Sequence, residues 1–181
     1  MILNNNMGRL LNEALVCVLL FPVISCTEET ESFNIQGYKY HLSVPSGFDR
    51  VPSPDLLPNP PKLGAIVFRD SLERKRIYIF SEVASKDLYE VAEERISIIK
   101  EMNTDAEVLS KEWIKEDRVI EIEYVMPNFD YAFKSYSKER FELINDKYYI
   151  RLLYFTLGQP IHSKNPKEEA GKVLRSFRKK R

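Results

Sequence analysis

The segment that most constrains the fold is Tyr148–Leu157, which has the length of a β-strand and is apolar on both faces. Successive side chains of a strand point to opposite sides of the sheet. The apolar side chains therefore form two sets, with Ile150, Leu152 and Tyr154 on one face and Leu153, Phe155 and Leu157 on the other. Because both sets must be removed from water, we expect this strand at the centre of a sheet that is covered on both sides.

Further segments have the alternation or the apolar content of strands and are separated by polar turns: 38–44, 65–68, 76–83, 107–114, 119–126 and 131–144. The last of these and Tyr148–Leu157 predict a hairpin about Asn145-Asp146, a dipeptide that tolerates the positive φ of a two-residue turn. The prolines of Asp49–Lys62 exclude a central strand there and predict a long surface loop. The sheet is therefore expected to be largely antiparallel.

Two segments have helical periodicity. Asp87–Met102 begins with Asp87 as the N-cap and Glu90 three residues later, which is capping-box spacing. Its apolar stripe consists of Leu88, Val91, Ala92, Ile96, Ile99 and Met102. The second helix is expected from Pro166 to about Arg178 with Asn165 as its N-cap, and its apolar face consists of Ala170, Val173, Leu174 and Phe177. Two amphipathic helices and a doubly buried sheet predict an α+β fold, a three-layer αβα sandwich.

An apolar run, Ala14–Cys26, precedes the expected domain. As a helix, its apolar part would span only about 16 Å, against a hydrocarbon core of about 30 Å, so it is too short to cross a membrane. Val23-Ile24-Ser25-Cys26 resembles the lipobox of bacterial lipoproteins. We therefore expect residues 1–25 to be a lipoprotein signal peptide and Cys26 to carry a lipid. An uncleaved leader or an ordinary secretory leader is the alternative, and either Met1 or Met7 can be the start.

The expected domain division follows from this leader. Residues 26–32 are polar and acidic and are interpreted as a tether, and residues 33–181 as a single domain. The expected location is the bacterial cell envelope, lipid-anchored at the periplasmic or outer-membrane face. Cys17 lies in the leader and Cys26 would be lipidated, so the domain has no thiol for a disulfide, a nucleophile or a metal site. The formal net charge of zero argues against a nucleic-acid-binding protein.

The order of elements resembles the PsbP-like superfamily. A Gly-Tyr-x-Tyr strand runs into Val44-Pro45-Ser46-Gly47-Phe48, and a proline-rich loop, a hairpin, a helix, long antiparallel strands and a final helix follow. This superfamily includes the extrinsic photosystem II protein, the Ran-binding Mog proteins and many bacterial lipoproteins. The resemblance covers about 33–177 and implies a PsbP-like αβα sandwich that acts as a non-enzymatic binding module.

Residues suited to catalysis are few. His41 and His162 are the only histidines, and a hydrolase that uses either with nearby carboxylates is an alternative hypothesis. Glu121 and Glu123 share one strand face and could form an acid–base pair, but we interpret them as part of a solvated outer face. The sequence has no nucleophile elbow and no glycine-rich phosphate loop. We therefore expect no catalytic residue, no metal site and no cofactor.

Apolar residues in the expected turns suit binding of an envelope protein partner. The candidates are Phe48, Leu56, Leu57, Asn128, Phe129 and Asp130. Packing of Leu56 and Leu57 onto their own domain is the competing interpretation, and a carrier of a small apolar ligand is the alternative function. The basic run Arg178–Arg181 predicts either contact with anionic lipid headgroups or a frayed tail. The sequence does not determine the oligomeric state.

Overall fold

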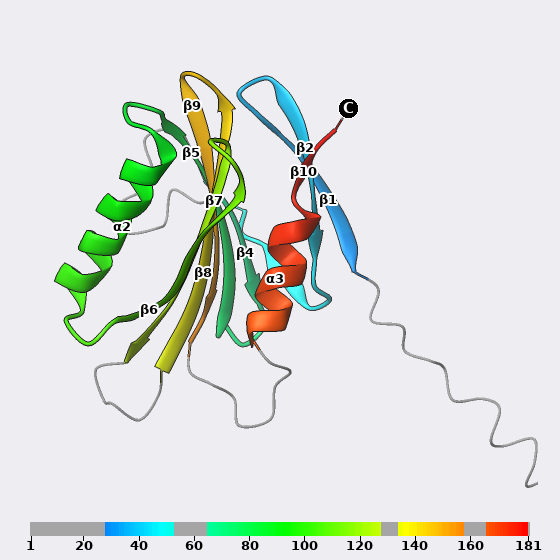
Figure 1. Cartoon of the computed structure of the whole chain (residues 1–181). Helices are drawn as coiled ribbons and strands as arrows, with labels where there is room; N and C mark the ends of the chain where they lie inside the picture. The colour runs from blue at the N-terminus through cyan, green and yellow to red at the C-terminus, as the bar shows by residue number, and fades with distance from the viewer. Residues whose placement is uncertain (1–27, 53–64, 128–133, 158–165, 181) are drawn as a thin grey trace, which may run out of the picture.

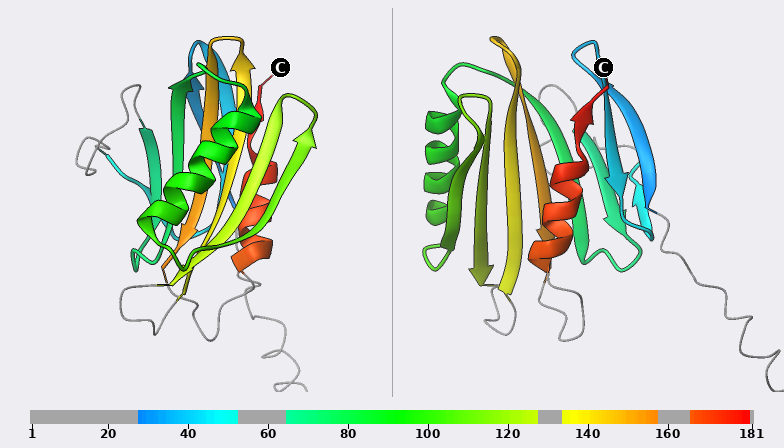
Figure 2. Two further views of the ribbon diagram at one scale, coloured as in Figure 1. Left: turned by 60° about the vertical axis from the view of Figure 1, so that its left-hand side comes forward. Right: turned by 45° about the vertical axis from the view of Figure 1, so that its right-hand side comes forward.

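A computed structural model describes residues 28–52, 65–127, 134–157 and 166–180. The described part is a three-layer α+β sandwich built on a large antiparallel sheet (Figure 1). Helix α2 (Leu88–Met102) covers one face of this sheet, which we call the α2 face. Helix α3 (Pro166–Ser176) covers the other, the α3 face, together with a small second sheet (Figure 2). The expected sandwich is therefore confirmed.

The large sheet has seven strands. Their order is β3 (Phe48–Arg50), β4 (Ala65–Asp70), β5 (Lys75–Val83), β9 (Tyr148–Thr156), β8 (Lys134–Asn145), β7 (Val119–Pro127) and β6 (Glu107–Lys115). All neighbouring pairs are antiparallel. Strand β9 lies between β5 and β8, and Leu152 is buried while Leu153 is half-buried. The strand lies at the centre of the sheet as expected, but its cover is unequal, because Ile150, Leu152 and Tyr154 are buried while Leu153 and Phe155 are half-buried and Leu157 is 38% exposed.

The small sheet has the order β1 (Glu29–Ile35), β2 (Tyr38–Val44) and β10 (Arg178–Lys179). Residues Gln36 and Gly37 make the two-residue turn between β1 and β2, with φ values of 50° and 81°. Glu29–Ser32, expected as part of a solvated tether, lies instead in β1, because its backbone pairs with β2. The frayed-tail alternative is also wrong for Arg178 and Lys179, which pair with β2.

Each face of the large sheet carries its own hydrophobic core. The α3 face packs β1, β2 and α3 on the sheet through Tyr40, Leu42, Leu174 and Phe177, among others. The α2 face packs the helix through Leu88, Ala92 and Ile99 on Ile120, Ile122 and Phe141. The buried face expected for α3 is confirmed. The prediction that Met102 belongs to the buried stripe of α2 is wrong, because Met102 is the last residue of the helix and is 77% exposed.

The local sequence signals predict the N-cap of α2 correctly but not the backbone conformation of the β8–β9 turn. The Asp87 side chain accepts a hydrogen bond of 2.8 Å from the Glu90 backbone N–H, which confirms the N-cap. In the β8–β9 hairpin no described residue of the turn has positive φ, contrary to expectation. Asn145 Oδ1 instead accepts hydrogen bonds from the backbone N–H groups of Lys147 and Tyr148. The turn is therefore closed by hydrogen bonds to the Asn145 side chain and not by a residue in the left-handed conformation.

The interpretation of Glu121 and Glu123 as solvated is wrong. Glu123 is only 2% exposed and Glu121 is also buried, because both side chains lie on the covered α3 face. Lys138 Nζ lies 3.0 Å from Glu121 Oε2 and 4.0 Å from Glu123 Oε2. Lys167 Nζ at the start of α3 lies 3.1 Å from Glu123 Oε1. The cations of the neighbouring strand and helix make this burial tolerable.

Candidate functional site

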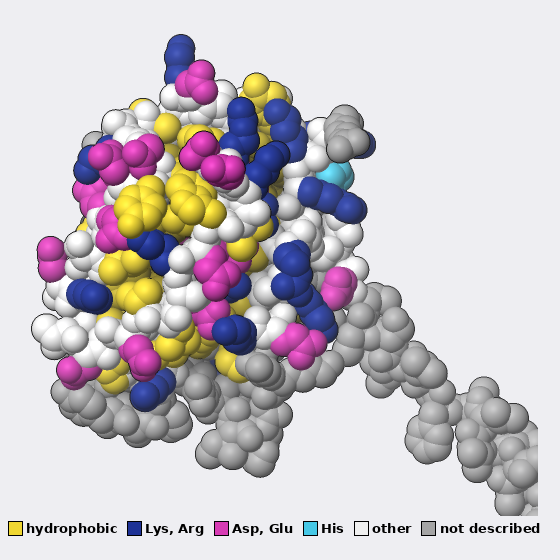
Figure 3. Space-filling view, in the orientation of Figure 1, with side chains coloured by type: hydrophobic (Ala, Val, Ile, Leu, Met, Phe, Trp, Pro, Cys, Tyr) yellow, Lys and Arg dark blue, Asp and Glu magenta, His cyan; other side chains and the backbone are white. Residues whose placement is uncertain are grey.

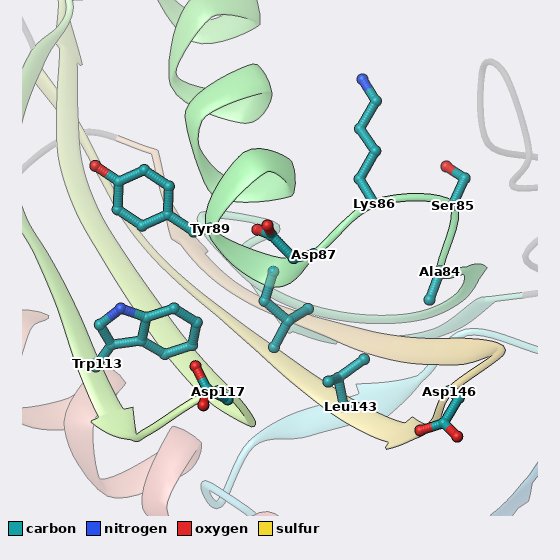
Figure 4. A pocket seen from close by; sticks show the side chains of 10 residues that line it. Ala84, Ser85, Lys86, Asp87, Tyr89, Trp113, Asp117, Leu143 and Asp146 are labelled. Atoms are coloured by element: carbon teal, nitrogen blue, oxygen red, sulfur yellow. The ribbon is translucent and has the colours of Figure 1, made fainter.

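A surface hollow of about 480 Å³ opens where α2 begins (Figure 4). It lies at the end of the large sheet that carries the β6–β7 and β8–β9 turns. The lining residues are Ala84, Ser85, Lys86, Asp87, Leu88, Tyr89, Trp113, Asp117, Leu143 and Asp146. The hollow therefore joins segments that lie far apart in the sequence.

Two aromatic side chains form the apolar wall of the hollow. Trp113 pairs with Ile120 across β6 and β7, which puts its indole on the α2 face. Tyr89 is the second residue of α2 and its ring stands on the same side as the indole (Figure 4). Trp113 is 41% exposed and Tyr89 is 47% exposed, whereas most large aromatic side chains of the described part are buried. Both rings thus retain surface that a partner can cover.

The ring of Tyr89 packs against the ammonium group of Lys111. Lys111 Nζ lies 3.8 Å from the centroid of the Tyr89 ring and also forms an ion pair with Glu93. An ammonium group over an aromatic face is attracted by the ring quadrupole. Burial opposes the charge of Lys111, but the hydrogen bond that Lys111 donates to Glu93 and its interaction with Tyr89 outweigh burial and raise the pKa of Lys111. The ring is therefore fixed between α2 and β6.

Charged groups surround the aromatic wall. The Asp87 carboxylate caps the helix, Asp117 lies in the β6–β7 turn with φ of 55°, and Asp146 lies in the β8–β9 turn. Lys86 Nζ lies 2.8 Å from Glu94 Oε2 on the exposed side of α2. The hollow therefore combines an aromatic wall with a mainly acidic rim, which is the mixture found at protein-binding surfaces.

A buried ion pair fixes α2 on the sheet beneath the hollow. Glu139 of β8 is 0% exposed, and Arg95 Nε lies 2.9 Å from Glu139 Oε1. The Tyr124 hydroxyl donates a hydrogen bond of 2.6 Å to the same carboxylate oxygen. Burial opposes the charge of Arg95, but the Glu139 carboxylate outweighs it and holds the pKa of Arg95 above its usual value. Burial, together with the nearby Glu139, also raises the pKa of Tyr124.

Of the residues predicted for partner binding, the structure describes only Phe48, which lies away from the hollow. Phe48 starts β3 at the edge of the large sheet opposite β6, and its half-buried ring packs against the α3-face core. Leu56, Leu57, Asn128, Phe129 and Asp130 lie outside the described residues, as do Cys26 and His162. Pro127 and Lys134, which flank 128–133, pair at the end of the sheet away from the hollow. Their role in partner binding stays a prediction.

The described neighbour of the His41 side chain is a hydroxyl group. Its Nδ1 atom lies 2.9 Å from the Ser32 hydroxyl on the outer side of the small sheet. Within the described ranges, no carboxylate forms an ion pair with His41 and no group of His, Cys, Asp and Glu side chains is arranged to hold a metal ion. Neither described helix is long and apolar enough to span a membrane.

A second hollow, of about 190 Å³, lies between the β1–β2 turn and strands β4 and β5. Its lining includes Gln36, whose side-chain N–H donates to the Ser81 hydroxyl at 3.3 Å. Both hollows thus expose charged or amide groups. Neither has the uniformly apolar lining that suits a carrier of a small apolar ligand.

Sequence reasoning missed Tyr89 and Trp113. The available signal was that Trp113, the only tryptophan of the chain, stands beside Ile114 in a strand pattern, so one of the two must face away from the core. In the structure both are exposed because β6 is an edge strand with a register shift between Trp113 and Lys115. Tyr89 carried no comparable signal, since its exposure depends on how α2 is placed against β6.

The architecture defines an α+β protein with helices on both faces of an antiparallel sheet. Solved structures of other proteins have a similar fold. The Saccharomyces cerevisiae Ran-binding protein Mog1p is similar with a TM-score of 0.58 and 13% identity, over 84% of this chain and 96% of Mog1p. A mutant of Mog1 gives a TM-score of 0.56 and 14% identity, over 83% of this chain and 95% of the other. These matches confirm the fold expected from the PsbP-like resemblance.

Sequence comparisons add nothing to this. The sequence matches no family model and no curated protein. The structural likeness at this low identity concerns the fold alone, so the site must be argued from the residues of this chain.

Proposed function

We propose that this protein is a non-enzymatic interaction module that binds a protein partner through the hollow at the start of α2. The observation that carries the proposal is the exposure of Trp113 and Tyr89 side by side on rigid elements within an acidic rim. Tryptophan and tyrosine dominate the binding energy of protein interfaces, because they offer a large contact area at a low cost in side-chain entropy. The fold is that of Mog1p, a Ran-binding protein, which supports a protein-binding role.

The location remains as the sequence predicts it. We propose that Cys26 carries a lipid and that the domain stays at a bacterial envelope membrane. The support is the lipobox-like run that ends at Cys26. Strand β1 begins three residues after this cysteine, so the domain would lie close to its anchor. Mass analysis of the N-terminal peptide of the protein isolated from its native membrane tests this directly, and a peptide that retains residues before Cys26 would contradict it.

The binding proposal is tested by comparing three forms of the full chain in affinity capture from native membranes. The forms are the unchanged protein, the double variant Tyr89→Ala/Trp113→Ala, and the control Leu72→Ala. Leu72 is a large apolar residue, 68% exposed in the β4–β5 turn, outside the hollow. We expect a protein that is retained by the unchanged form and the control and lost with the double variant.

The affinity for the captured protein can then be measured through Trp113 itself, because it is the only tryptophan of the chain. Binding at the hollow should shield the indole and shift its fluorescence to shorter wavelength. Tyr89→Ala should weaken binding about 30-fold, which corresponds to an interface hot spot of about 2 kcal/mol. Equal capture by all three forms would exclude the hollow as the binding surface.

A further inference from the structure

The charged side chains on the outer face of the small sheet are Lys and Arg. Arg178 lies opposite His41 across β10 and β2, so both side chains share the face that points away from the core. The Lys180 backbone N–H donates to the Lys39 carbonyl at 2.7 Å, which extends the same pairing and puts Lys180 opposite Lys39. We call Lys39, His41, Arg178 and Lys180 the basic face.

Among the described positions of the small sheet, no carboxylate shares the basic face. On β1, Ser32 pairs with His41 and Asn34 pairs with Lys39, so both lie on the same face, and both are uncharged. Glu29 and Glu31 pair with Val44 and Leu42 and therefore belong to the opposite side of the small sheet. Among the residues that the structure describes, Lys39, Arg178 and Lys180 have no ion-pair partner, and all three are exposed.

This arrangement does not stabilise the fold. Like charges directly opposite one another on a sheet, such as Lys39 and Lys180, are unfavourable. The core requires only that the inner side of the small sheet be apolar, as Tyr40 and Leu42 are. The positive charge continues along the chain, because residues 172–180 hold five Lys and Arg and no acidic residue. Figure 3 shows Lys and Arg side chains gathered over α3 and the end of the chain.

The basic face lies further along the β1–β2 pair than the proposed point of attachment, because Glu29 pairs with Val44 whereas Ser32 and Asn34 pair with His41 and Lys39. Strand β1, the neighbour of β2, begins three residues after Cys26. Three residues reach at most about 11 Å, which is comparable to the screening length of about 8 to 10 Å in physiological salt. A lipid on Cys26 would therefore hold the start of β1 within electrostatic range of the membrane, so the basic face meets the headgroups when the small sheet lies along the membrane surface.

We propose that the basic face docks on anionic lipid headgroups and so orients the anchored domain, with the hollow at the start of α2 left free for its partner. The orientation rests on the proposed lipid attachment, but the affinity of the face for anionic lipid does not. Lys and Arg near an anionic surface each contribute attraction that is lost at high salt.

The test uses the full chain with Cys26→Ser, so that no lipid is attached, and two kinds of vesicle. One kind is pure phosphatidylcholine, and the other contains phosphatidylglycerol. The apolar leader contributes to binding on both, so the ratio of the two affinities isolates the electrostatic part. The triple variant Lys39→Gln/Arg178→Gln/Lys180→Gln should lower this ratio about 100-fold, at about fivefold per charge.

The matched control removes three exposed cations from the α2 and β6 side, with Lys100→Gln, Lys115→Gln and Arg118→Gln. It should change the ratio less than about threefold, and circular dichroism should show that both triple variants are folded. Equal losses in the two triple variants, or no preference of the parent chain for phosphatidylglycerol, would overturn the proposal. If the chain prefers phosphatidylglycerol vesicles but Cys26 of the native protein carries no lipid, the lipid-binding role of the basic face is supported and only the proposed anchor is excluded.

Discussion

The two sides of the large sheet differ in charge and in what they expose. On the α2 side, the helix and its cap carry Asp87, Glu90, Glu93, Glu94 and Glu101 against Arg95 and Lys100. The aromatic wall of the hollow is exposed beside them. On the α3 side, the chain from Lys172 to Lys180 has only positive charges, and Phe33, Tyr40 and Phe177 are buried in mutual ring contacts. A formal net charge of zero thus conceals an uneven distribution of charge between the two sides.

The buried carboxylates differ between the sides as well. On the α2 face, Glu139 depends on Arg95, which comes from the helix and therefore joins two layers. On the α3 face, Glu121 is paired within the sheet, with Lys138 at 3.0 Å and Arg140 at 3.7 Å. Besides Arg95, Arg151 of β9 lies 4.0 Å from the other oxygen of Glu139. One close ion pair therefore ties α2 to this carboxylate, whereas Lys138, Arg140 and Lys167 share the two carboxylates of the opposite face.

The largest effect is expected for Arg95→Met. Removing the guanidinium leaves Glu139 fully buried without its main counter-charge, which should reduce the free energy of unfolding by about 3 to 5 kcal/mol. Denaturant unfolding measures this. The control Lys86→Met breaks the exposed pair with Glu94 and should leave the unfolding curve nearly unchanged, because water screens this pair. Equal costs would show that the buried pair does not hold α2.

Lys138→Met should have a smaller effect on the α3 face, about 1 to 3 kcal/mol. Arg140 still lies 3.7 Å from Glu121, and Lys167 still lies 3.1 Å from Glu123, so neither carboxylate is left alone. The same unfolding measurement ranks the two variants. A loss larger than that of Arg95→Met would reverse the comparison between the faces.

Replacing the helix cap should act on the α2 side alone. Asp87→Ala removes the acceptor for the Glu90 backbone N–H and should cost about 1 kcal/mol. Hydrogen exchange should become faster in the first turn of α2 and stay unchanged in β2 and α3. The exposed Glu101→Ala serves as the control, since Glu101 caps nothing near the N-terminus of the helix. Faster exchange in both layers would indicate that they unfold together.

The α3 side should respond to alkaline pH through Tyr40. Burial, with added repulsion from Glu142 and Tyr38, raises the pKa of Tyr40 from 10.0 to about 12. Because the folded form holds the phenolic proton more tightly, the resulting stability is present below about pH 10 and is lost as the pH rises through 12. Tyr40→Phe should reduce the slope of unfolding free energy against pH in this range. An unchanged slope would mean that other tyrosines account for the alkaline loss.

Part of the fold could be predicted from local pattern. The two apolar faces of Tyr148–Leu157 require cover on both sides, and β9 is indeed the centre of the sheet. The Asp87 cap and the apolar face of α3 were equally readable, because capping and helical spacing act within a few residues. The order of elements indicated the fold that the structure shares with Mog1p.

Other features could not be predicted. Alternation in β7 showed that Glu121 and Glu123 face away from Ile122, but not that α3 and Lys138 cover that face. Strand β10 is too short to have a pattern and exists because β2 offers it a free edge. The hollow likewise needs Tyr89 and Trp113 from separate elements to meet.

The sequence by itself determined the two helices and the longer strands and which of their apolar faces must be buried, since these follow from side-chain periodicity and local hydrogen bonding. Only the tertiary structure decided which polar faces are covered, where Arg178 and Lys180 align with Lys39 and His41, and how the hollow at the start of α2 is assembled. The physical reason is that strand pairing and layer packing join residues far apart in the chain, and no local pattern records which partners meet.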